Sequence, residues 1–205
     1  FFRYQNGLRI RCTSSYALRV AEDFTERYEN IAITGIEYGM FATNVAKPFR
    51  LNTRVYSCSL ILNDIPFGWR GRYNEDTDLC LQVLSAGYCT VLIIAVNVDK
   101  CCTLKQKGGN TDTVYQGNGR LTMSRSLERL WPGIVTTDRR FGRPQHKVDW
   151  SKFDTQLIRR KDIDWDNIHL EAKKYETKLV AVDEVKSEQL RRLVYGETNE
   201  ADQCS

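Results

Sequence analysis

The chain has 205 residues, of which 41% are hydrophobic and 27% charged, a composition typical of a soluble globular domain with a substantial core. No apolar run approaches the ~20 residues that a membrane-spanning helix needs, so we expect a soluble, cytoplasmic protein without a membrane partner. Seven cysteines without a C-x-x-C pair, with only two histidines, argue against a structural zinc site and for free thiols. Because the first residue is Phe1 rather than Met, we expect a piece of a longer chain.

The net charge of +4 conceals an uneven distribution along the chain. Residues 100–161 carry 14 Lys and Arg against 5 Asp and Glu, a balance of +9, which leaves 16 against 21, or −5, elsewhere. A basic middle segment indicates a polyanionic partner, although a solvated surface also explains a run of charge.

The first part of the chain predicts an α/β arrangement. Short runs rich in β-branched residues indicate buried strands, and a stretch with apolar residues at the helical period indicates a helix. The expected elements are two short strands around an Asn6-Gly7 turn, a helix at 14–28 capped by Ser14 or Ser15, and strands at 31–36 and 52–62.

The stretch from Pro66 to Gly87 reads PFGWRGRYNEDTDLCLQVLSAG and is the most informative part of the sequence. A loop rich in glycine and aromatic residues leads into residues whose apolar members recur at the helical period. Asn74 is a good N-cap, and Gly87 stands where a helix is expected to end. The sequence therefore predicts a loop that delivers the chain to a helix between these two residues.

Three carboxylates, those of Glu75, Asp76 and Asp78, fall in or beside the first turn of this helix. Free N–H groups and the helix dipole favour negative charge there, so helix stabilisation is an ordinary explanation for them. The preceding loop suggests more, because Trp69 lies between two glycines just ahead of the carboxylates, as the wall of a pocket would. Asp78 points to a different helical face from Asp76 and is expected to act only as a cap.

Beyond Gly87 the sequence predicts one more buried strand, a polar excursion and then mainly helical or extended segments. The expected elements are a strand at 89–98, a helix at 120–131, an extended segment at 134–148, helices at 162–182 and 183–195, and a disordered tail at 196–205. The expected organisation is thus a main region at 1–150, a helical extension at 151–195 and the tail at 196–205.

The pattern Trp-x-Gly, then Glu-Asp-x-Asp and a helix, resembles the acidic acceptor-site motif of glycosyltransferases with the GT-A fold, the β-galactosyltransferases among them. The matching residues are Trp69, Gly71, Glu75 and Asp76. In those enzymes the Asp of the Glu-Asp pair is a general base at a helix N-terminus. The resemblance therefore implies that Asp76 is the catalytic base and that Glu75 orients the acceptor or the sugar.

The longer run RYNEDTDLCLQVLSAGYCTVL, with Gly-Gly-Asn at 108–110, is similar to one branch, the TET-associated glycosyltransferases of phages and their relatives. The resemblance covers about residues 1–150 and implies an α/β fold, a GT-A-like (Rossmann-related) mixed sheet flanked by helices. It implies transfer of a sugar from a nucleotide sugar, such as a UDP-sugar, to the hydroxymethyl group of 5-hydroxymethylcytosine in DNA, with Mn²⁺ or Mg²⁺. No Asp-x-Asp motif precedes Trp69, so the N-terminal nucleotide-binding half is expected to be missing.

Trp69, Gly71 and Tyr73 are the expected acceptor-binding residues, because an aromatic loop can stack on a base flipped out of a duplex. Core packing also explains both aromatic side chains. A third metal ligand in GT-A enzymes is often a C-terminal His, and His146 is the candidate here. A lone His beside basic residues is more often a surface or phosphate contact.

The basic middle of the chain can be interpreted as a nucleic-acid track, because its cations alternate with aromatic residues. The Gly-Gly-Asn run could let backbone N–H groups approach a phosphate, and a hairpin turn explains it as well. The expected phosphate and nucleic-acid contacts are Lys105, Lys107, Gly108, Gly109, Asn110, Arg125, Arg129 and Arg143.

Two alternatives to a DNA-modifying enzyme stay open on the sequence. One is a GT-A transferase whose acceptor is a protein or a glycan, since the acidic motif does not specify the acceptor. The other is a non-catalytic DNA-binding module that keeps the fold without its nucleotide-binding half.

Overall fold

The computed structural model of the chain describes residues 1–5, 8–42, 47–99, 117–140 and 142–168. Several sequence expectations lie outside these residues: the turn at 6–7, the contacts at Lys105, Lys107 and 108–110, the helix at 183–195 and the tail. None of the described helices is both long and apolar enough to cross a membrane.

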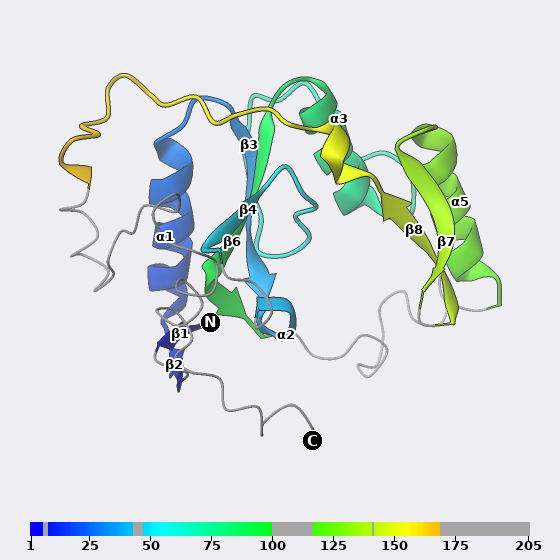
Figure 1. Ribbon diagram of the computed structural model, residues 1–205, viewed down its shortest axis with the longest axis horizontal. Helices are drawn as coiled ribbons and strands as arrows, with labels where there is room; N and C mark the ends of the chain where they lie inside the picture. Colours follow the sequence, from blue (N-terminus) through cyan, green and yellow to red (C-terminus); the bar gives the residue numbers. More distant parts are fainter. Residues whose placement is uncertain (6–7, 43–46, 100–116, 141, 169–205) are drawn as a thin grey trace.

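A mixed six-stranded sheet forms the centre of the fold (Figure 1). Its strands are β1 (Phe2–Gln5), β2 (Leu8–Arg11), β3 (Ile31–Tyr38), β4 (Phe49–Leu51), β5 (Leu60–Ile61) and β6 (Cys89–Val98). The order is β2-β1-β6-β3-β5, with β4 also paired to β6. Only β3 and β6 pair in parallel, and the other pairings among the described strands are antiparallel. The expected α/β class with a mixed sheet flanked by helices is confirmed.

Helix α1 (Ser14–Glu26) covers one face of the sheet. Ala17 and Ala21 are fully buried there, against the side chains that β3 and β6 direct to that face. The cap is Thr13, whose side chain accepts a hydrogen bond from the Tyr16 backbone N–H at 3.2 Å, and not Ser14 or Ser15 as expected. Thr13 remains extended, which is the conformation that an N-cap needs.

Helix α3 (Glu75–Ser85) covers the opposite face of the sheet and is buried on two sides. Leu79, Cys80 and Val83 pack on the sheet, as the sequence period predicts. Leu81 points the other way and is also fully buried, in a separate apolar cluster with Leu127. The helix is therefore a central layer rather than an outer cover.

A small unit packs on the outer side of α3 and consists of α5 (Gly119–Leu130), β7 (Val135–Arg140) and β8 (Arg143–Val148). The two strands form an antiparallel hairpin, and Leu127 of α5 and Val135 of β7 bury themselves against Leu81. The helix expected at 120–131 and the extended segment expected at 134–148 are both confirmed. Two short elements complete the described fold, α2 (Gly39–Ala42) and the 3₁₀ helix η1 (Trp150–Lys152).

The strand expected at 52–62 is wrong, since within this range only Leu60 and Ile61 pair with the sheet. Asn52 and Cys58 adopt left-handed φ values of +53° and +44°, which interrupt an extended chain. Val55 is buried as a loop residue against β3 and α3, whereas Leu62 is 44% exposed. The apolar run at 60–62 therefore forms only a two-residue strand, and the buried residue ahead of it, Val55, lies in a loop.

The segment after η1 crosses the end of the sheet, from the α3 side to the α1 side (Figure 1). Asn30 holds it, because its Nδ2 donates to the Gln156 carbonyl and its Oδ1 accepts from the Ile158 N–H, both at 2.8 Å. The helix expected at 162–182 does not begin at Asp162, since residues 161–167 form turns and bends, and residues 169–182 lie outside the described part of the chain.

Candidate active site

The N-terminus of α3 follows Asn74, which has the left-handed backbone angles φ 54° and ψ 32°. The side chain of Asn74 makes no capping hydrogen bond, contrary to expectation. Its Nδ2 instead donates to the Met123 carbonyl of α5 at 2.9 Å. Asn74 thus ties the start of α3 to the small unit and leaves the first turn of the helix to other acceptors.

Asp76 takes over part of this capping. Its Oδ1 accepts from the Thr77 backbone N–H at 2.7 Å and from the Thr77 hydroxyl at 3.3 Å. Within the described part of the chain, Oδ2 of Asp76 makes no hydrogen bond, and the side chain is half-buried. One oxygen is therefore held by the helix while the other remains available to a ligand.

Asp76 lies in a pocket of about 290 Å³ between the aromatic loop, α3 and the sheet. Trp69, Glu75 and Asp76 all line it, so three of the sequence-predicted site residues meet in one place. Trp69 is 62% exposed, which excludes core packing as the reason for its presence. Cys80 forms part of the floor, and burial raises the pKa of its thiol to about 12, so it stays protonated.

Gly71 and Tyr73, the other two expected acceptor residues, do not line this pocket. Gly71 has a φ of +79°, a conformation that glycine adopts without steric cost, and it shapes the loop that carries Trp69. Tyr73 is half-buried, with the Arg72 guanidinium 5.8 Å from its ring centre. Their contribution in the free protein is therefore to loop conformation.

Asp78 is a structural anchor on the opposite side of α3 from this pocket, with only 1% of its side chain exposed. Arg70 donates to both of its oxygens, at 2.7 and 3.0 Å, and Gln82 adds a third hydrogen bond at 2.9 Å. Trp131 completes the set with a 2.7 Å hydrogen bond from its indole N–H. Asp78 thus points away from Asp76, as expected, but it fixes the loop and the small unit instead of capping the helix.

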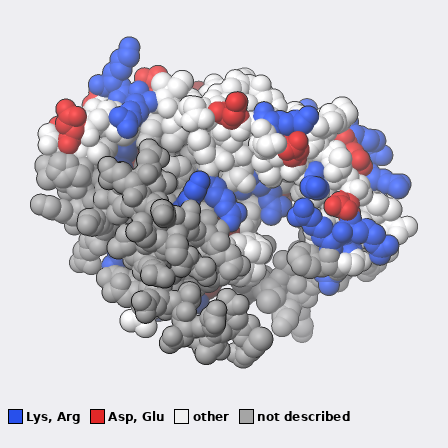
Figure 2. Space-filling model, viewed as in Figure 1, with Lys and Arg blue, Asp and Glu red and all other residues white. Residues whose placement is uncertain are grey.

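A larger cleft of about 750 Å³ opens between the sheet and the small unit. Tyr56 lines both this cleft and the Asp76 pocket, so the two cavities share a wall. The charged residues that line the cleft are Glu37, Arg50, Arg54, Arg120, Arg140 and Lys147. Figure 2 shows Lys and Arg side chains on both sides of the hollow next to the small unit.

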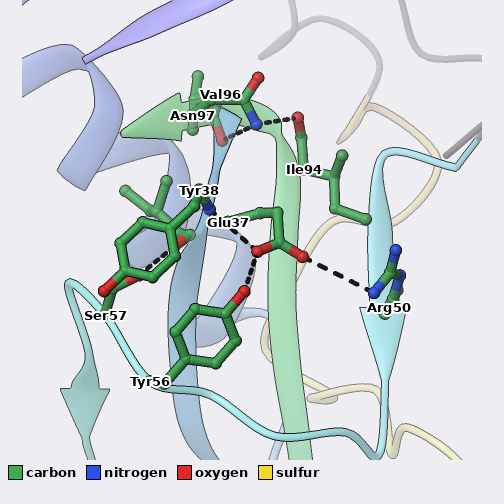
Figure 3. Close-up of polar contacts among 9 residues, drawn as sticks. Glu37, Tyr38, Arg50, Tyr56, Ser57, Ile94, Val96 and Asn97 are labelled. Atoms are coloured by element: carbon green, nitrogen blue, oxygen red, sulfur yellow. Dashed lines mark hydrogen bonds and ion pairs between the residues drawn. The ribbon is translucent and has the colours of Figure 1, made fainter. Parts of the chain in front are cut away.

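Glu37 is the single acid among the described residues of the cleft, and it is 1% exposed. Its Oε1 accepts from the Tyr38 backbone N–H at 2.9 Å and from the Tyr56 hydroxyl, while Oε2 lies 3.7 Å from the Arg50 guanidinium (Figure 3). Burial and the neighbouring carboxylate raise the pKa of Tyr56. Sequence reasoning missed this pair, although an acid one residue before the end of a mostly apolar strand, as in IAITGIEY, was an available signal.

His146 comes from β8 and also lines the cleft. Burial and the charge of Arg54 hold its pKa below the ordinary 6.5, while Asp76 acts in the opposite sense. Asp76, Arg54 and His146 are therefore within electrostatic range of one another. Over the described ranges, no three His, Cys, Asp or Glu side chains gather closely enough to hold a metal ion.

The expected nucleic-acid contacts that the structure describes lie outside both cavities. Arg125 and Arg129 are exposed on α5, and Arg143 is exposed at the start of β8. The four cysteines described, Cys12, Cys58, Cys80 and Cys89, are free thiols, as expected.

Comparison with known proteins identifies a family. A family model described as TET-Associated Glycosyltransferase matches residues 3–109, just over half of the chain, and includes β3, the aromatic loop, α3 and β6. No curated protein and no solved structure matches the chain.

Proposed function

Because the chain belongs to the TET-associated glycosyltransferase family, we propose that it transfers a sugar from a nucleotide sugar to the hydroxymethyl group of 5-hydroxymethylcytosine in DNA. Family membership supports glycosyl transfer. We propose in addition that the donor is a nucleotide sugar, that the acceptor is DNA and that a carboxylate acts as the catalytic base.

The observation that carries the proposal is the meeting of Trp69, Glu75 and Asp76 in one pocket at the start of α3. Transfer to a hydroxyl requires a base within hydrogen-bond reach of a weakly acidic proton. Asp76 suits this role because Thr77 holds Oδ1 in place while Oδ2 makes no hydrogen bond among the described residues. Glu75 is exposed beside it and can orient the acceptor or the sugar.

In the proposed reaction, the acceptor oxygen forms a bond to the anomeric carbon of the sugar. Asp76 Oδ2 takes the hydroxyl proton as this bond forms. The bond between the anomeric carbon and the phosphate oxygen breaks, and the nucleoside diphosphate leaves with its electron pair. The aromatic loop serves the acceptor, because the exposed Trp69 can stack on a flipped base and bring its hydroxymethyl group to Asp76.

A divalent cation, Mn²⁺ or Mg²⁺, belongs to the proposal only as an ion carried by the donor diphosphate. Mg²⁺ is commonly held by substrate phosphates and waters with one or two carboxylates. Glu37, the buried acid of the cleft, is already engaged by Tyr56 and Arg50, and the described residues form no cluster of three ligands. These residues do not fit a protein-built metal site, so no step is assigned to the metal.

Mass spectrometry of digested nucleosides tests the proposal. The chain is incubated with UDP-glucose or another nucleotide sugar, Mg²⁺ or Mn²⁺, and duplex DNA that contains 5-hydroxymethylcytosine. We expect a hexose-sized mass gain on the modified nucleoside and none on unmodified DNA, which offers no hydroxymethyl oxygen. A gain on proteins or glycans alone would establish a different acceptor, and DNA binding without transfer to any acceptor would favour a non-catalytic module.

A further inference from the structure

The cleft between the sheet and the small unit carries more positive charge than the described residues around it neutralise. Arg50 and Arg54 enter from the sheet side, and Arg120, Arg140 and Lys147 from the small unit. Among the described residues that line the cleft, one carboxylate faces these cations, that of Glu37, and it is engaged by Arg50 and Tyr56.

Three of these cations make no ion pair with any described residue, namely Arg54, Arg140 and Lys147. Arg54 instead lies over the Tyr56 ring, 4.3 Å from its centre. Burial lowers the pKa of His146, and the charge of Arg54 lowers it further, which places the Arg54 guanidinium within electrostatic range of this side of the cleft. Arg54 is partly buried, whereas Arg140 and Lys147 are exposed at the cleft, so these charges are accessible to an anion that enters from solvent.

The size of the cleft suits a small anionic ligand better than a DNA duplex. Its volume of about 750 Å³ lies in the range of small-molecule sites, which is ~300–1,000 Å³. A duplex instead needs an open surface, such as the one where Arg125 and Arg129 are exposed. Tyr56 lines both the cleft and the Asp76 pocket, so the two cavities are adjacent and a ligand with its phosphates in the cleft could place its sugar beside Asp76.

We infer that this cleft binds the diphosphate of a nucleoside diphosphate sugar, with Arg54 and Lys147 as its principal cationic contacts from the two sides. The inference rests on the proposed function and adds the place of the donor. It differs from the expectation that the nucleotide-binding half is missing, because it assigns the diphosphate contacts to residues of this chain. The basic residues of the sequence do not show which of two anions they bind. The donor phosphates are assigned to the cleft, and the DNA phosphates to the exposed surface of α5.

Calorimetric titration of the chain with UDP, and separately with inorganic pyrophosphate, tests the inference without any transfer step. Lys147→Ala and Arg54→Ala should each weaken UDP binding by about tenfold or more, since hydrogen bonds to charged groups contribute ~1.5–3 kcal/mol and 1.4 kcal/mol is a factor of ten. Lys147→Arg should retain most of the affinity. The control is Arg19→Ala, which removes an exposed cation from α1 and should change nothing.

Pyrophosphate should compete with UDP, because the diphosphate is the shared group. The inference is overturned if both cleft variants bind UDP as tightly as the unmodified chain, if UDP does not bind at all, or if duplex DNA without any sugar donor displaces UDP competitively. UDP binding that depends on Lys147 and Arg54, without transfer to modified DNA, would support the cleft assignment while contradicting the proposed acceptor.

Discussion

The indole Nε1 of Trp131 donates a 2.7 Å hydrogen bond to Oδ1 of Asp78, 53 residues earlier in the chain. The same carboxylate accepts two hydrogen bonds from Arg70, the neighbour of Trp69 in the aromatic loop. One buried side chain therefore connects the loop that lines the Asp76 pocket to the unit that lines the larger cleft. Both cavities depend on a residue that lines neither.

Asp78→Ala should lower the free energy of unfolding by about 3 kcal/mol, because it removes a buried carboxylate and leaves buried donors unpaired. Arg70 is 46% exposed and regains water, which keeps the loss near the lower end of values for buried pairs. Urea unfolding followed by tryptophan fluorescence measures the change. The control is Asp64→Ala, an exposed position that should shift stability by no more than ~0.5 kcal/mol. Equal stability of the two variants would refute the anchor role.

Gly35 of β3 packs against the loop that follows β4, and a larger residue does not fit there. A Cβ added to Gly35 would lie 2.3 Å from Val55 Cγ1 and 2.7 Å from the Ser57 carbonyl oxygen. Gly35→Ala should therefore destabilise the fold by about 1–3 kcal/mol through overpacking. Gly68→Ala is the matched control, because no atom lies within 4 Å of its added Cβ. Thermal unfolding of the two variants should separate them clearly, and a Gly35→Ala midpoint at the unmodified value would contradict the close approach.

The parts of the fold that could be predicted from sequence are those determined by local patterns. The period of Leu79, Cys80 and Val83 predicts the inner face of α3, and Gly87 follows the helix with a φ of +87°. The apolar run of β6 likewise predicts a buried strand. In each case the signal and the structure lie within one segment.

Sequence patterns fail where distant segments decide the conformation. Asn74 has the residue type of a cap for α3, but its amide donates to Met123, 49 residues away. Val55 has the apolar character of a strand residue, whereas it is buried as part of a loop between β3 and α3. The role of Glu37 as a cleft residue depends on Tyr56 and Arg50, which no helical or strand period brings together.

The lowered pKa of His146 makes part of the stability depend on pH. The folded state disfavours the imidazolium, so the unfolded state binds the proton more tightly. The stability that the fold gains from a neutral His146 is therefore fully present above pH 6.5 and is lost as pH falls from 6.5 through the lower pKa of the folded state. His146→Gln, which cannot titrate, should show a smaller decrease of unfolding free energy between about pH 7.5 and pH 5. Identical pH slopes in urea unfolding would contradict the shift.

The exposed arginines of α5 should contribute to DNA binding alone. Replacing Arg125 and Arg129 together by Ala should reduce the slope of log K against log salt by about one for each phosphate that the variant no longer binds. UDP binding should stay unchanged, because neither residue lines the cleft. Fluorescence anisotropy at several salt concentrations measures the slope, with Arg19→Ala as the control for removal of a surface charge. Equal slopes for the double variant and the control would show that these arginines do not contact DNA.

Asp76 has two possible roles that one substitution can separate, because its two oxygens have different surroundings. The hydrogen bond from the Thr77 N–H to Oδ1 stabilises the start of α3, and an Asn amide oxygen can accept it as well. Asp76→Asn should therefore leave the unfolding free energy and the affinities for UDP and DNA nearly intact. It should lower the rate of sugar transfer by ~10²-fold or more, the usual contribution of a positioned base. Glu75→Gln provides the comparison, because an orienting residue should affect the KM for the acceptor more than it affects kcat. A near-normal rate for Asp76→Asn would leave Asp76 with the capping role only.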